Sequence, residues 1–141
     1  MDNSGNIYTA NYKSHDVSKI APDGTSTTLG TTGYSPYEIT IDTAGNIYTA
    51  NYQDNTVTKI APDGTSTTLG TTGTNPYGIA IDTAGNIYTA NATSNDISRI
   101  APDGTSTILG TTGSNPQGIT IDKMGTIYVT NVGSNDVTKL I

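Results

Sequence analysis

The chain has 141 residues, with twelve Asp and Glu against six Lys and Arg, a net charge of −6 and no cysteine. This is the length of one domain, and an acidic balance without basic clusters argues against a nucleic-acid partner, because such binding depends on Lys and Arg replacing counterions. The lack of Cys excludes disulfides, thiolate nucleophiles and cysteine-ligated zinc, and no apolar run approaches the roughly 18 residues of a membrane span.

Hydrophobic residues make up only 33% of the chain, and Phe and Trp are absent. Small and polar residues take their place, above all Thr, Ser, Asn and sixteen Gly. This composition favours β structure with many turns and with sheets that pack through small side chains.

The sequence repeats with a period of 40 residues. Residues 42–81 and 82–121 are identical at 29 of 40 positions, and residues 2–41 match 42–81 equally often. A fixed period of this length is typical of repeat architectures and propellers. We therefore expect a single domain, 1–141, built from the repeats 2–41, 42–81 and 82–121 and the half repeat 122–141.

Within each repeat the pattern predicts four short strands, a to d. In the second repeat, residues 37–41 and 46–50 alternate around a turn with Gly45, and residues 57–61 and 65–69 flank a Pro-Asp-Gly turn. In chain order the strands are b-c-d, a-b-c-d, a-b-c-d and a-b-c, so the sequence predicts fourteen strands and no helix.

Four antiparallel strands per 40 residues are typical of the blade of a β-propeller. A β-trefoil is the alternative, because it also uses repeats of about 40 residues. The trefoil requires twelve strands, whereas this chain predicts fourteen and ends within a unit, so we expect an all-β propeller of about 3.5 repeats.

The run NPYGIAIDTAGNIYTAN at residues 75–91, with VTKIAPDG at 57–64, resembles the NHL-type repeat and the blades of streptogramin (virginiamycin B) lyases. The resemblance implies the propeller fold. Those lyases have a metal-assisted site that contains His and Glu, but His15 is the only histidine here and Glu38 the only glutamate. Neither is repeated or can be matched to that site, so we expect no catalytic residue, no metal site, no cofactor and no enzymatic activity.

The strand order leaves the ring incomplete, because the first sheet lacks strand a and the last lacks strand d. An open arc exposes apolar faces and strand edges, which favour association. The sequence thus predicts a homo-oligomer, most simply an eight-bladed dimer. A seven-bladed dimer requires one duplicated b-c pair to be displaced or shared at each junction, and a third possibility is that the chain is a fragment of a longer array.

The b–c and d–a loops are predicted to share one face, and they vary between repeats while the opposite turns barely change. Tyrosines gather in or beside these variable loops and are the candidate ligand-binding residues, with carbohydrate or peptide as the expected ligand. The alternative for two of them is packing between blades beside Pro36 and Pro76. The candidates are Tyr12, Tyr34, Tyr37, Tyr52 and Tyr77.

Two other repeated features have structural interpretations. A tyrosine recurs in the middle of strand b and is expected in the core, and the Asp-x-x-Gly turns lack the carboxylate spacing of a calcium loop, so turn chemistry explains them. The recurring tyrosines are Tyr8, Tyr48, Tyr88 and Tyr128.

These features together predict a non-enzymatic, self-assembling scaffold or binding module that recognises its ligand through the b–c and d–a face. The alternatives are a purely structural repeat, recently amplified or engineered and without ligand, and a propeller enzyme of lyase type.

Overall fold

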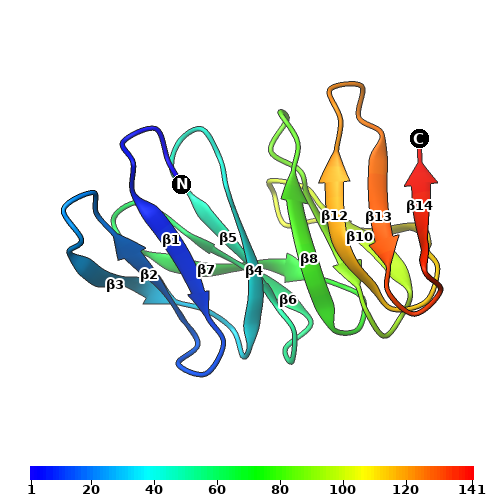
Figure 1. The fold of residues 1–141 in the computed structure, drawn as a ribbon, viewed down its shortest axis with the longest axis horizontal. Coiled ribbons are helices and arrows are strands. Elements are labelled where there is room, and N and C mark those ends of the chain that lie inside the picture. Colours follow the sequence, from blue (N-terminus) through cyan, green and yellow to red (C-terminus); the bar gives the residue numbers. More distant parts are fainter.

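The computed structural model describes residues 1–141 and contains fourteen strands and no helix. The strands form four antiparallel sheets in the predicted order, which confirms the all-β propeller (Figure 1). The first sheet holds β1 (Ile7–Asn11), β2 (Asp16–Ile20) and β3 (Ser26–Thr31), and the second holds β4 (Pro36–Ile41), β5 (Ile47–Asn51), β6 (Thr56–Ile60) and β7 (Ser66–Thr71). The third holds β8 (Pro76–Ile81), β9 (Ile87–Asn91), β10 (Asp96–Ile100) and β11 (Ser106–Thr111), and the fourth holds β12 (Pro116–Ile121), β13 (Ile127–Asn131) and β14 (Asp136–Leu140). The structure contains no helix that is long and apolar enough to cross a membrane.

The observed strands are displaced by about one residue from the expected ones. Strand b of the second sheet runs from Ile47 to Asn51, because Ile47 pairs with both Ile41 and Ile60, and Asn51 pairs with Pro36 at the other end. Strand a therefore begins at the proline. This places Glu38 within β4.

Each sheet has two faces of different composition. In the second sheet, Ile47, Thr49 and Asn51 of β5 lie on what we call the front face, together with Ile60 of β6. The intervening residues, such as Tyr48, Ala50 and Val57, lie on the back face.

A back face packs on the front face of the next sheet. One buried cluster joins Val17 of the first sheet to Ile47 and Ile60 of the second, and another joins Val57 of the second to Ile87 of the third. A third cluster joins the third sheet to the fourth. The core is thus a series of layers between sheets.

The Asp-x-x-Gly turns are closed by their own side chains. In the second sheet, Oδ1 of Asp42 accepts the backbone N–H groups of Ala44 and Asn46, and Oδ2 accepts the Asn46 amide and the Tyr48 hydroxyl at 2.7 and 3.0 Å. Gly45 takes the positive φ of 85° that the turn requires. Turn chemistry therefore accounts for these aspartates.

The recurring strand-b tyrosines fill the core less completely than expected. Tyr48 is 6% exposed and belongs to the core, as predicted. Tyr8, Tyr88 and Tyr128 are only half-buried. Their hydroxyls donate to the turn aspartates Asp2, Asp82 and Asp122.

A buried asparagine fixes the loop end of each front face. Asn51 accepts the Thr49 hydroxyl at 2.9 Å and donates to the hydroxyls of Thr56 and Thr58. In the fourth sheet the residue equivalent to Thr49 is Val129, and Oδ1 of the buried Asn131 consequently has no hydrogen-bond partner.

We expect Val129→Thr to stabilise the protein by about 1 kcal/mol, because its hydroxyl would satisfy this orphan acceptor, and an unpaired buried polar group costs about 1–3 kcal/mol. The measurement is the free energy of unfolding in urea. The control is Val132→Thr, where valine is 53% exposed and the added hydroxyl would face solvent. Equal effects of the two substitutions would contradict the interpretation that Oδ1 of Asn131 is an unsatisfied acceptor.

Alkaline pH should weaken the fold through Tyr48. Burial, followed by the hydrogen bond and the charge of Asp42, raises the pKa of Tyr48 from 10.0 to about 12. The folded state therefore holds this proton more tightly than the unfolded chain, so the stabilisation is complete below pH 10 and is lost as the pH rises towards 12. We expect a loss of about 1–2 kcal/mol from this group, allowing for solvent screening. The measurement is the free energy of unfolding in urea, between pH 10 and pH 12, for the wild type and for Tyr48→Phe. If this free energy falls equally steeply with pH in the variant, Tyr48 is not the responsible group.

Candidate functional site

The b–c and d–a loops lie on the same face of the molecule, as predicted. The N–H of Tyr52, in the b–c loop of the second sheet, donates to the carbonyl of Ser35 in the preceding d–a loop at 3.0 Å. The N–H of Ala92 donates to the carbonyl of Asn75 in the same way at 2.8 Å. Backbone hydrogen bonds between adjacent loops therefore support this face.

Four of the five candidate tyrosines form one aromatic cluster, which we call the tyrosine cluster. Tyr37 on β4 lies at its centre, with ring centroids 5.0 Å from Tyr12, 4.9 Å from Tyr52 and 4.5 Å from Tyr77. Tyr77 lies on β8, and the other two directly follow β1 and β5. Three successive sheets thus contribute to one surface.

The cluster is only partly covered. Tyr12 and Tyr37 are 41% and 40% exposed, whereas Pro36 and Pro76 beneath the cluster are buried. Tyr77 is half-buried and stacks on Tyr37 from the neighbouring sheet, as packing between blades would require, whereas Tyr37 also remains open to solvent. Burial, with a smaller contribution from the neighbouring phenols, raises the pKa of Tyr37 above its ordinary value.

Tyr34 does not join the cluster. Its ring packs edge-on against His15 at 4.8 Å and is 59% exposed. The cluster also has no counterpart in the later repeats, because Ala92, Val132 and Gln117 occupy the equivalent positions. The aromatic surface is thus confined to the first three sheets.

His15 has a structural role. It has a positive φ of 57°, like Asn55, Asn95 and Asn135 at the same position of the other repeats. Its Nδ1 accepts the N–H of Ser35 at 3.0 Å, just as Oδ1 of Asn55 accepts the N–H of Asn75. The histidine replaces an asparagine that joins consecutive sheets.

Glu38 extends from β4 towards β8. Its carboxylate accepts the N–H of Ile79 at 2.8 Å. The neighbouring Gly78 is needed chiefly because a Cβ there would collide with the backbone carbonyl of Gln117 on β12. Loss of solvation raises the pKa of Glu38, and the hydrogen bond partly offsets this. The carboxylate thus links two inner strands.

These residues do not fit a metal-assisted site. No hydrogen bond joins His15 to Glu38, and no group of three or more His, Asp or Glu side chains lies close enough together to hold a metal ion. Both candidate acid–base groups are already engaged with backbone N–H groups of neighbouring segments. We therefore derive no catalytic step from them.

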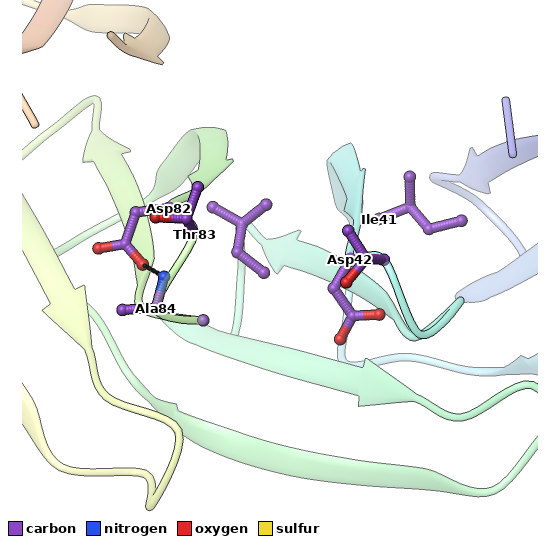
Figure 2. A pocket seen from close by; sticks show the side chains of 8 residues that line it. Ile41, Asp42, Asp82, Thr83 and Ala84 are labelled. Carbon is purple, nitrogen blue, oxygen red and sulfur yellow. Dashed lines mark hydrogen bonds between the residues drawn. The ribbon is translucent and has the colours of Figure 1, made fainter. Parts of the chain in front are cut away.

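The opposite face has shallow grooves between successive a–b turns. One of about 390 Å³ is lined by Ile41, Asp42, Ile81 and Asp82 (Figure 2). The figure shows Asp82 bonded to the backbone of Ala84 within its own turn. Because these carboxylates are occupied by turn contacts, the grooves offer little for ligand recognition.

The role of His15 can be tested with three substitutions. We expect His15→Asn to keep the free energy of unfolding within about 0.5 kcal/mol, because Asn tolerates positive φ and supplies an acceptor. His15→Gly keeps the backbone conformation but loses the acceptor, at a cost of about 1 kcal/mol. His15→Ala also strains the backbone and should cost about 2 kcal/mol. Urea unfolding measures all three, and an order other than Asn, Gly, Ala would refute the role.

Comparisons with known proteins agree with the fold. The chain superposes on a structure of streptogramin B lyase with a TM-score of 0.81 at 19% identity, covering 99% of this chain and 49% of the lyase. It also superposes on a catalytically inactive His-to-Ala variant of virginiamycin B lyase from Staphylococcus aureus with quinupristin, with a TM-score of 0.79 at 24% identity, covering 99% of this chain and 53% of that one.

The chain thus spans about half the length of the solved lyases that it matches. No curated protein matches it. The model of the virginiamycin B lyase family matches residues 1–141. Since this match extends over the whole sequence, the chain belongs to the virginiamycin B lyase family.

Proposed function

We propose that this chain is a non-enzymatic binding module that recognises a carbohydrate or a peptide through the tyrosine cluster. The observation that supports this most is the gathering of four rings from three sheets at centroid distances of 4.5–6.5 Å, with the rings of Tyr12 and Tyr37 about two-fifths exposed. Two of the rings, Tyr12 and Tyr52, come from the variable b–c loops, where packing alone would not require aromatic residues.

The chemistry of the cluster suits a flat, uncharged ligand. Tyrosine rings provide a large contact area with little loss of side-chain entropy, and their hydroxyls can both donate and accept hydrogen bonds. The phenols are uncharged at neutral pH, as tyrosines ordinarily are, and the net charge of −6 disfavours anionic ligands. A sugar ring, or an aromatic or proline side chain of a peptide, meets these requirements.

The supports of the cluster are rigid. Tyr37 and Tyr77 lie on paired strands, and the loop after β5 is fixed by the hydrogen bond from Tyr52 N–H to Ser35. A preformed surface loses little conformational entropy on binding, which favours affinity. The quinupristin in a neighbouring lyase structure supplies a first peptide-like probe.

The test is an array of neutral glycans and aromatic-containing peptides, with quinupristin added as a soluble probe. We expect Tyr37→Ala to weaken binding of a captured probe about 5- to 30-fold, because central aromatic anchors contribute about 1–2 kcal/mol or more. Tyr37→Phe should keep most of the affinity if stacking dominates. Tyr34→Ala is the matched control outside the cluster and should bind like wild type.

A blank array at high protein concentration would contradict the proposal and favour a structural repeat without ligand. Equal losses in the Tyr37→Ala and Tyr34→Ala variants would also contradict it, because the effect would then not depend on the cluster.

Family membership favours a second candidate, a lyase-type enzyme. Such an enzyme would need acid–base groups, and His15 and Glu38, the only histidine and the only glutamate of the chain, are the candidates. Incubation with quinupristin and a divalent cation, followed by chromatography, tests for turnover. If the wild-type chain consumes quinupristin and both His15→Asn and Glu38→Gln abolish this consumption, the chain is an enzyme and the proposal of a non-enzymatic binding module is wrong.

A further inference from the structure

The two ends of the stack present faces that are buried everywhere else in the molecule. At the back face of the fourth sheet, Val137 is 60% exposed, whereas its equivalents Val57 and Ile97 are completely buried. At the front face of the first sheet, Ile7 is 49% exposed, whereas Ile47 is completely buried. The first sheet and the fourth lie at opposite ends of the molecule (Figure 1).

These end faces are complementary to each other because they come from one repeat. At every internal interface a back face packs on a front face, as Val17 does on Ile47 and Ile60. The fourth sheet supplies an unused back face and the first sheet an unused front face. The partner that best matches either face is therefore the opposite end of a second copy of this chain.

Both exposed faces keep the internal arrangement of the buried ones. On the front face, Asn11 accepts the Thr9 hydroxyl at 3.1 Å and donates to Asp16 and Ser18, as Asn91 does with its own neighbours in the third sheet. On the back face, the Lys139 ammonium lies 5.9 Å from the Tyr128 ring, the same distance as between Lys59 and Tyr48. The strands that remain are therefore already arranged for packing, although the first sheet lacks strand a and the fourth lacks strand d.

Length agrees with pairing of two copies. One copy covers 49% of one solved lyase and 53% of another, so two copies contain about as many residues as one lyase chain. Lys139 on the back face does not oppose the contact, because Lys59 occupies the equivalent position on the back face of the second sheet, which packs on the third sheet.

We propose that the back face of the fourth sheet binds the front face of the first sheet of a second copy, head to tail, so that two chains close one ring. This contact does not depend on the ligand proposed above. It assigns a partner to each of the two exposed faces and leaves the tyrosine cluster free.

The experiment is sedimentation velocity of the 141-residue chain, together with native mass spectrometry. We expect a species of twice 14.6 kDa. Val137→Glu and Ile7→Glu should each weaken the association at least tenfold, because each places a charge in both interfaces of the ring. Thr67→Glu is the matched control, since it adds the same charge at an exposed position on the outer strand β7.

The two variants also separate head-to-tail pairing from pairing of like faces. Each substitution alone must dissociate the dimer if unlike faces meet, whereas dissociation by only one of them indicates that identical faces meet and overturns the proposal. A monomer, a ladder of larger species, or a dimer that resists both substitutions overturns it as well. Both replaced side chains are already about half exposed or more, so circular dichroism should show an unchanged fold in the variants.

Discussion

The constraint on which this structure depends is that every sheet has two apolar faces, and each of them is stabilised by being covered. The side chains of Ile47 on the front face and Val57 on the back face of the second sheet are both completely buried, each against a different neighbour. Full burial of such a side chain is worth about 1.5–3 kcal/mol. A single sheet cannot bury both of its faces, so the repeat is stable only as part of a stack.

Polar groups decide how the sheets are aligned. The Asn51 side chain at one end of the sheet and the Asp42 turn at the other satisfy their hydrogen bonds within the repeat, and each is repeated almost unchanged. In each b–c loop, the fold requires only one residue that adopts positive φ and accepts a hydrogen bond from a backbone N–H of the next d–a loop. This is why the position of Asn55 can hold His15, and why the loop tips can diverge without loss of the fold.

Much of the fold could be predicted because the period of 40 residues specifies strand number and order directly, and because Gly45 and its equivalents mark turns that require positive φ. The exact strand ends could not be predicted, because the pairing of Pro36 with Asn51 depends on a bulge in β4 that no local sequence pattern reveals. The sequence predicted only that the five tyrosines lie on the same face. It did not predict which of them are in contact. Ser35 adopts a positive φ of 56° although serine does not favour it, and this residue separates Tyr34 from Pro36 and Tyr37.

Comparison of His15 with the same position in the other repeats gives a different interpretation from the residue type alone. A lone histidine in a member of a lyase family suggests chemistry, but its alignment with Asn55 and Asn95 indicates an acceptor for a backbone N–H, which the contact with Ser35 confirms. A second difference between the repeats has no comparable structural role. Tyr12 and Tyr52 of the first two repeats are replaced by Ala92 and Val132 at the same position of the later ones. In a ring of two copies, this asymmetry would place two aromatic surfaces on one face, separated by sheets that lack them. A ligand with repeating units could then contact both surfaces, and its second contact would benefit from the high effective concentration that the first one creates.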